Sequence, residues 1–364
     1  MNETIKKGLT ETLRIFLAVV FIASGFVKAV DPVGFSFKLE EYFSPSVFNL
    51  EFLSSYALVF AVFVVMLELL LGLALLFKLE YQKVLLALIV LCIFFGFLTF
   101  YSAYFNVVTD CGCFGDALKL TPWQSFIKDL VLLVGLVILW FRQSNFKSPT
   151  IPSRRAGIWG VGILMLIASY FIYMGIYSEP LIDFRSYKIG TDLVVERNKL
   201  NQNPSQYKTV YTLLNPTTNE TKEVDQDEYV ATKALWEEGT PWVIQDELTR
   251  TELVKQGYQS EISKFKIEAD GMDITEDILS ASHVVLLFSY DPKSLTTEQI
   301  AQAERKVRAN PLVFGVSTAS NTFSKIKNAT MDGTAIKTIA RSNPFVMVLQ
   351  KGKIIRKVPV YEYQ

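Results

Sequence analysis

Apolar residues are concentrated in the first half of the chain, where they form long runs. These runs extend roughly from Leu9 to Val27, Leu53 to Phe77, Val84 to Phe105, Trp123 to Phe141 and Ala156 to Tyr177. Each approaches the ~20 residues that a helix needs to cross the hydrocarbon core of a bilayer. We therefore predict five transmembrane helices. The first is the weakest, because Glu11 and Arg14 lie in its first turns and should extend toward the membrane surface.

The second half of the chain has shorter apolar segments separated by polar ones, which is typical of a folded domain outside the membrane. Residues 282–291 and 311–318 are near-continuous apolar runs, which predict buried strands. Residues 296–310 predict a helix with Thr297 as its N-cap, and residues 332–343 predict another. Residues 344–360 predict a hairpin that turns at Lys351 and Gly352.

The predicted order of these elements, β-α-β-α-β-β with Pro344 opening the third strand, resembles the thioredoxin fold. The resemblance implies that Pro344 is in the cis form, and it covers about residues 281 to 360. A working thioredoxin carries C-x-x-C at the start of the helix after the first strand. Here that place reads "SYDPKSLTTEQ", and the domain contains no cysteine. We therefore expect a thioredoxin-like fold without thiol chemistry of its own.

The segment between the apolar half and this domain is harder to interpret. Residues 207–224 read as two strands joined by a polar turn, and Trp236 and Trp242 are expected to pack in a small core. We expect four parts in the chain. They are a four-helix transmembrane domain over 1–145, a cytoplasmic loop with the fifth span over 146–180, an α+β region of unclear fold over 181–280, and the thioredoxin-like domain over 281–364.

Composition supports a membrane protein and excludes several other classes. The chain has 364 residues, half of them apolar, and a mean hydropathy of +0.28, which is high for a water-soluble protein. It carries 36 basic and 36 acidic residues, so nothing suggests a nucleic-acid partner. His283 is the single histidine, and with three cysteines in the chain we expect no metal site.

The positive charges that flank the predicted spans indicate how the chain is oriented in the membrane. They gather in three segments, with Lys6, Lys7 and Arg14 in the first, Lys78 and Lys83 in the second, and Arg142, Lys147, Arg154 and Arg155 in the third. Five spans place these segments on one side, which should be the cytoplasm. The residues from 109 to 116 and everything after Tyr177 then face outward. For a bacterial inner-membrane protein this side is the periplasm, where disulfides persist.

Two of the three cysteines, Cys111 and Cys113, stand one residue apart in "TDCGCFGD". In an extended chain their Cα atoms would be about 6.6 Å apart, near the end of the disulfide range at about 6.8 Å. Gly112 permits the bend that would bring them closer. So small a ring is strained and labile, as a redox-active disulfide should be. The alternatives are a structural bridge and two unpaired thiols. Cys92 lies within the third span and is interpreted as a core residue.

Ionisable residues in or near the spans need an explanation, because charges are costly in a bilayer. They are Lys28, Asp31, Glu68, Lys128 and Asp129. One interpretation is that they hold the helices together, with Lys28 paired to Asp129. The other is that they line a pocket for a quinone headgroup or carry protons from a thiol oxidation.

The first part of the chain resembles the DoxX-like and MauE (methylamine utilisation) membrane families. The matching pattern comprises Ser24, Gly25, Lys28, Asp31, Pro32 and Tyr42, then Glu68 and Gly72, and finally "CGCFGD" followed by Trp123. The resemblance covers about residues 9 to 142, and the cysteine-containing part is more similar to MauE. The fusion to a degenerate thioredoxin-like tail resembles a type found in Bacteroidetes. Several members of these families are linked to thiol oxidation or disulfide formation.

Two functions are compatible with these observations, and the sequence does not establish that the chain is an enzyme. In the first, Cys111 and Cys113 exchange electrons with a periplasmic thiol protein, and the bundle passes them to a quinone. Other four-helix thiol oxidases carry a second cysteine pair, which this chain lacks. In the second, the chain is a non-catalytic assembly or maturation factor whose periplasmic domain docks a client protein.

Overall fold

A computed structural model describes residues 3–108, 112, 114–142 and 150–364, and it divides the chain into two compact units. The first unit combines Met1–Thr191 with Lys266–Gln364, and the second is Asp192–Phe265. The first unit contains both the apolar helices and the C-terminal sheet. The candidate site lies entirely within this first unit.

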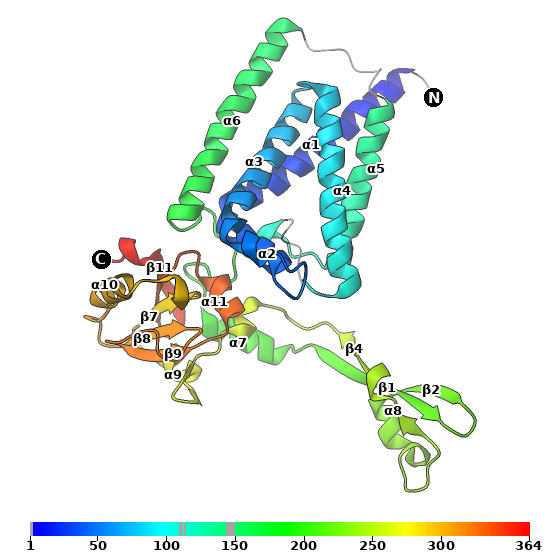
Figure 1. The fold of residues 1–364 in the computed structure, drawn as a ribbon, viewed down its shortest axis with the longest axis vertical. Coiled ribbons are helices and arrows are strands. Elements are labelled where there is room, and N and C mark those ends of the chain that lie inside the picture. Colours follow the sequence, from blue (N-terminus) through cyan, green and yellow to red (C-terminus); the bar gives the residue numbers. More distant parts are fainter. Residues whose placement is uncertain (1–2, 109–111, 113, 143–149) are drawn as a thin grey trace. The chain divides into compact units, whose positions relative to one another are not determined.

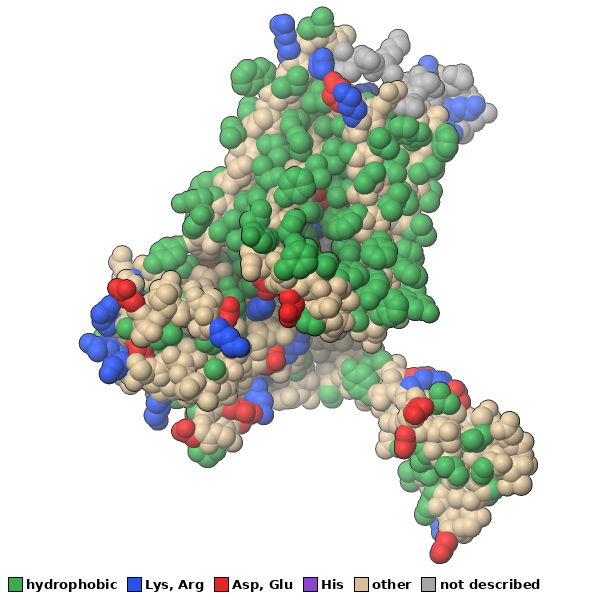
Figure 2. Space-filling model, viewed as in Figure 1, with side chains coloured by type: hydrophobic (Ala, Val, Ile, Leu, Met, Phe, Trp, Pro, Cys, Tyr) green, Lys and Arg blue, Asp and Glu red, His purple; other side chains and the backbone are tan. Residues whose placement is uncertain are grey.

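The five predicted transmembrane helices are confirmed within the described residues. They are the long helices of Figure 1: α1 (Glu3–Val30), α3 (Ala57–Leu76), α4 (Tyr81–Phe105), α5 (Pro122–Phe141) and α6 (Ile151–Tyr177). Figure 2 shows that hydrophobic side chains cover most of the visible surface of this part. An outer surface of this kind matches lipid, because the bilayer core offers no water to polar groups.

Small residues let the helices approach each other closely. A side chain at Gly25 of α1 would meet Leu69 of α3, and one at Gly72 of α3 would meet Phe21 and Ile22 of α1. Close backbone contact at glycines is a common way to pack helices in a membrane. A core of buried leucines joins α1, α3, α4 and α5, and α6 contributes Ala168 and Ile172 to a second core. The expected four-helix bundle with one added helix is therefore present.

Arg14 is buried against the end of α3. It donates hydrogen bonds to the backbone oxygens of Leu75 (2.7 Å) and Leu76 (2.5 Å) at the end of α3. It also pairs with Glu11 (2.9 Å), which in turn pairs with Lys78. Carbonyl groups at the end of a helix lack helical partners, and a cation satisfies them well.

A short amphipathic helix that the sequence analysis did not identify, α2 (Pro32–Phe43), follows α1 directly. Asp31 is its N-cap, because its side chain accepts a hydrogen bond from the Gly34 amide (2.9 Å), and Pro32 occupies the first helical position. In Figure 1, α2 lies across one end of the bundle. The 3-10 helices η1 (Glu51–Tyr56) and η2 (Gly115–Ala117) complete the connections around it.

The C-terminal domain has the predicted thioredoxin-like arrangement. Its sheet has the order β11-β10-β7-β8-β9-β5-β6, in which β7 is parallel to β8 and antiparallel to β10. The strands are β5 (Glu268–Ala269), β6 (Met272–Asp273), β7 (Val284–Ser289), β8 (Val313–Ser317), β9 (Lys327–Thr330), β10 (Phe345–Gln350) and β11 (Lys353–Pro359). The helices are α9 (Thr275–Ser280), α10 (Thr297–Val307) and α11 (Gly333–Ile339).

Two local predictions for this domain can be compared directly with the structure. The Asn343–Pro344 peptide bond is cis, as predicted. The N-cap of α10 is Thr296 and not Thr297, since the Thr296 side chain accepts from the Gln299 amide in a capping box. β5, β6 and β9 were not predicted, because they are too short to show an apolar pattern.

The second unit is a small sheet centred on β1, which pairs antiparallel with β2, β3 and β4. Its elements are α7 (Leu193–Gln202), β1 (Gln206–Asn215), β2 (Glu220–Asp225), α8 (Gln226–Ala231), β3 (Val243–Ile244) and β4 (Arg250–Lys255). The two predicted strands are confirmed as β1 and β2. Trp242 packs against the core as expected. Trp236 is 46% exposed, so its predicted burial is wrong.

Candidate functional site

The described neighbours of the cysteine pair, Gly112 and Phe114, contact the membrane domain. Cys111 and Cys113 themselves lie outside the described residues. Gly112 has a φ of 62°, and a Cβ there would come within 3.1 Å of Lys38 on α2. Position 112 therefore favours glycine both for its backbone conformation and for its close approach to α2. Further along the loop, the Phe114 ring lies 5.6 Å from Lys128 Nζ of α5.

Arg341 of the thioredoxin-like domain connects this loop to the start of α2. Its Nε atom lies 2.8 Å from each carboxylate oxygen of Asp31, and its Nη2 atom lies 3.1 Å from Asp116 Oδ2. Arg341 also donates to the backbone oxygens of Lys337 and Ala340. The guanidinium is buried and almost every donor direction is used, so its position is well determined.

The two carboxylates that share Arg341 respond to it in opposite ways. Burial alone would raise the pKa of Asp31, but the charges of Arg341 and Arg185 and the bond from Gly34 outweigh it, and the pKa is lowered. The pKa of Asp116 is raised, because burial and the nearby charge of Asp31 outweigh the attraction of Arg341. Of the two carboxylates, Asp31 is thus the one that stays ionised, and Asp116 is the one that takes up a proton more readily.

The contact between α2 and the thioredoxin-like domain also includes aromatic and charged side chains. The rings of Phe37 and Tyr290 meet edge to face at 5.2 Å. Lys337 pairs with Glu40 at 2.7 Å, and its Nζ atom lies 4.8 Å from the Phe37 ring centroid. Tyr290 directly follows β7. The part of this domain that contacts α2 is therefore the part in which a working thioredoxin carries its cysteines.

Hydroxyl and amide groups occupy that region in place of thiols. Ser289 donates to Asn343 Oδ1 at 2.7 Å, and Asn343 Nδ2 donates to the Asp291 backbone oxygen at 2.7 Å. Asn343 Nδ2 is also 3.0 Å from Ser294 Oγ. These bonds connect the loop after β7 to the cis-proline loop. They are structural contacts between side chains that have no redox capacity.

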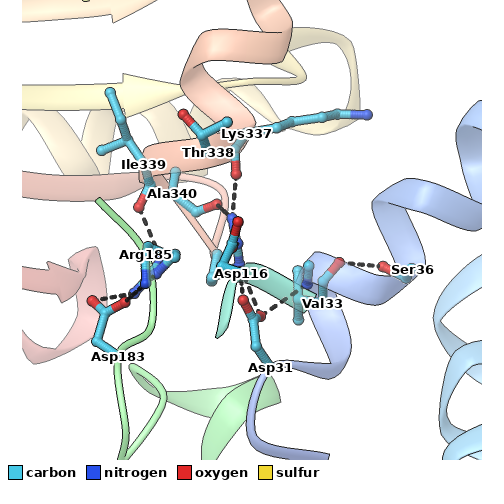
Figure 3. Close-up of polar contacts among 12 residues, drawn as sticks. Asp31, Val33, Ser36, Asp116, Asp183, Arg185, Lys337, Thr338, Ile339 and Ala340 are labelled. Atoms are coloured by element: carbon cyan, nitrogen blue, oxygen red, sulfur yellow. Dashed lines mark hydrogen bonds and ion pairs between the residues drawn. The ribbon is translucent and has the colours of Figure 1, made fainter. Parts of the chain in front are cut away.

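A second buried charge cluster attaches the segment after α6 to the same domain, and the sequence analysis missed it. Arg185 binds Asp183 (2.7 Å) and Glu179, and it donates to the Ile339 backbone oxygen at 3.0 Å (Figure 3). Lys357 of β11 also binds Asp183, at 2.9 Å. Burial and the charge of Arg185 lower the pKa of Lys357 to about 8. Glu179, Asp183 and Arg185 lie in a loop and Lys357 lies within β11, and no sequence pattern marks them as partners.

Four of the five predicted intramembrane residues lie around one cavity, and the fifth, Asp31, does not. Lys28 binds Glu68 at 2.7 Å and Ser24 at 2.8 Å, deep in the bundle. The expected pairing of Lys28 with Asp129 is therefore wrong. Asp129 pairs with its neighbour Lys128 at 2.5 Å and accepts from Thr99 at 3.2 Å.

Asp31 is separated from this group and belongs to the Arg341 contact described above.

One cavity of about 20 Å³ lies between the two buried ion pairs. This volume suits a water molecule and is too small for a quinone ring. Among the described residues, no cluster of histidine, cysteine and carboxylate side chains could hold a metal ion.

Comparison with known proteins supports the expected family for the transmembrane part. Residues 6–142 match the family model of the methylamine utilisation protein MauE, so this segment is similar to that family. The chain is also similar to Protein TlpB of Flavobacterium psychrophilum, with 29% identity over 148 residues. That match spans 40% of this chain and 40% of the relative. No solved structure matches the chain.

Proposed function

We propose that this chain is a bacterial inner-membrane protein whose Cys111–Cys113 pair exchanges electrons with a partner thiol protein in the periplasm. The observation that carries the proposal is a cysteine pair in the loop before α5 of a MauE-like domain, with Gly112 against α2 and Asp116 bound by Arg341. The described neighbours of the pair are thus held by both the membrane domain and the thioredoxin-like domain.

The proposed chemistry is a thiol–disulfide exchange followed by reoxidation. A thiolate of the partner attacks one sulfur of the Cys111–Cys113 disulfide and forms a mixed disulfide, which the second thiol of the partner then resolves. The partner leaves as a disulfide, and Cys111 and Cys113 become thiols. A quinone in the membrane then accepts two electrons and two protons from them and becomes a quinol. The small cavity in the bundle is not the quinone site of this proposal.

In this proposal the thioredoxin-like domain positions the loop and does no thiol chemistry. Its Arg341 binds Asp116, which lies three residues after Cys113, and its Tyr290 packs on α2. The domain therefore supports the reactive loop by contact at Asp116.

The topology belongs to the same proposal. The segments rich in lysine and arginine favour a cytoplasmic N-terminus and a periplasmic C-terminal domain. Reporter fusions test this map. A phosphatase should be inactive after Lys83 and active after Ser178, and the opposite result would reverse the orientation.

Cysteine substitutions test the function. Cys111→Ser and Cys113→Ser should each abolish the thiol–disulfide exchange with the partner protein. Membrane abundance and thermal stability should stay normal, because closing so short a ring removes little entropy from the unfolded chain. Cys92→Ser, which changes the buried thiol of α4, is the matched control and should keep activity. If both loop variants have normal abundance and a normal phenotype, the redox proposal is wrong.

A second candidate function, an assembly or maturation factor, is favoured by the second unit. That unit exposes large apolar side chains, including Tyr207 (60%), Val230 (64%) and Leu248 (58%), as protein-binding surfaces often do. In this case Tyr207→Ser with Val230→Ser should abolish the phenotype while both cysteine variants retain it. Normal function of that double variant would remove the support for a client-binding role.

A further inference from the structure

Two ion pairs lie side by side along one cavity inside the transmembrane bundle. Lys28 of α1 pairs with Glu68 of α3 at 2.7 Å, and their side chains are 3% and 4% exposed. Lys128 and Asp129 of α5 pair at 2.5 Å, and Asp129 is 5% exposed. All four residues line the same cavity. Two positive and two negative charges meet there, so the group as a whole is neutral.

The cavity has the size and the lining that an ordered water requires. Its volume is about 20 Å³, whereas one water needs about 10–15 Å³. A buried water also needs two to four polar partners. The Ser24 hydroxyl and the four charged side chains supply them, and the other lining residues include Cys92. Each charged group already has a partner within its own ion pair, and a water in the cavity would add a hydrogen-bond partner between the two pairs.

We propose that this cavity binds a single water molecule, which joins the two ion pairs into one hydrogen-bonded network and carries a proton between Asp129 and Glu68. The network starts at Lys128, whose side chain is 21% exposed and whose Nζ atom lies near the ring of Phe114 in the cysteine loop. It ends at Glu68, which is almost fully buried. Ionisable side chains inside membranes often form such relays.

The proton balance of this relay is simple. A proton that reaches Asp129 neutralises its carboxylate. The water donates one of its own protons to Glu68 and takes up the proton of Asp129, so the water is regenerated. One positive charge has then moved from Asp129 to Glu68. No electrons are transferred, and the step needs no other reactant.

If these residues have a purely structural role, the cavity is expected to be dry and closed to protons from the solvent. Ion pairs that only hold helices together need no water and no access for protons. The two accounts therefore differ in whether the cavity exchanges protons with the solvent. Cys92 lines the cavity, so its thiol proton reports on that exchange.

The test uses the full-length chain with Cys111→Ser and Cys113→Ser, in which Cys92 is the remaining thiol. The infrared S–H stretching band of Cys92 is recorded after transfer into D2O, and Cys92→Ser in the same background assigns the band. We expect the S–H band to be lost while the amides of the transmembrane helices remain protonated. A band that persists as long as those amides shows a dry cavity and overturns the proposal.

A second measurement tests the proton itself. In the same background, lowering the pH should produce the C=O band of a protonated carboxylic acid in the bundle, and Glu68→Gln should remove it. If Glu68→Gln leaves the carboxylic bands unchanged, Glu68 takes up no proton and the relay is wrong. Both reactive cysteines are replaced in these experiments, so their outcome is independent of the redox function proposed above.

Discussion

Replacing Arg341 with methionine should release the thioredoxin-like domain from α2. Arg341 is 3% exposed by side chain, and it binds Asp31 and Asp116, which are 17% and 31% exposed. Removing one partner from a buried ion pair costs about 3–5 kcal/mol. Because Asp31 and Asp116 regain water when the domain undocks, we expect about 3 kcal/mol. This shifts the docking equilibrium by about two powers of ten.

Lys337→Met is the matched control for this prediction. Lys337 contacts the same helix, but solvent reaches both groups of its ion pair with Glu40, whose side chains are 33% and 32% exposed, whereas the Arg341 side chain is 3% exposed. Exposed ion pairs contribute about 0–1 kcal/mol. Its loss should therefore change docking by less than about tenfold.

Hydrogen–deuterium exchange of the full-length protein in lipid discs measures the effect. Amides of α2 should exchange faster in Arg341→Met than in the unaltered protein, and those of β7 and β10 should stay protected because the domain remains folded. Lys337→Met should resemble the unaltered protein. If the two variants have equal effects on α2, Arg341 does not anchor the domain and the argument from burial is wrong.

Three further predictions concern other buried charges. Asp116→Asn should leave docking unchanged or improved, because its raised pKa shows that the charged form is disfavoured in the fold; a loss as large as that of Arg341→Met in the same exchange experiment would contradict this. Lys28→Met alone should destabilise the bundle by about 3–5 kcal/mol in a thermal or denaturant titration, while Lys28→Met with Glu68→Leu should be markedly milder. Because Lys357 has a pKa lowered to about 8, its charged form weakens the fold below pH 8, and stability should rise by up to about 3 kcal/mol as the pH increases from 8 to 10.5. Lys357→Met should remove that rise. If the free energy of unfolding of this variant still rises with pH as in the unaltered protein, Lys357 is not the group responsible.

Periodicity and turn chemistry were sufficient to predict the main elements of the fold. The apolar runs identify the transmembrane helices, because a bilayer requires length and hydrophobicity that are visible in the sequence. The buried strands β7 and β8 and the hairpin at Lys351–Gly352 were also predicted from the sequence. α2 was missed, since its short amphipathic pattern lies next to a much stronger apolar signal. The partners of Arg14 were not predicted, because its acceptors are backbone oxygens more than 60 residues away in sequence.

The candidate site was less predictable than the fold. Lys28, Glu68, Lys128 and Asp129 stand out in a sequence, because charges in an apolar run demand a partner. Which partner each one takes depends on helix rotation and register, which the sequence does not show. The Asp31–Arg341 pair joins residues 310 positions apart. Arg341 lies in an ordinary polar segment, so no local pattern connects it with the membrane domain.

The central claim is that Cys111 and Cys113 change redox state during function, and thiol trapping in living cells tests it most directly. Cells are quenched with acid and labelled with a thiol reagent that adds mass, and the Cys92→Ser protein is used so that only the loop pair reacts. The account predicts a disulfide in normal cells and a shift to two free thiols when quinone is depleted. A pair that keeps one redox state under both conditions would contradict it.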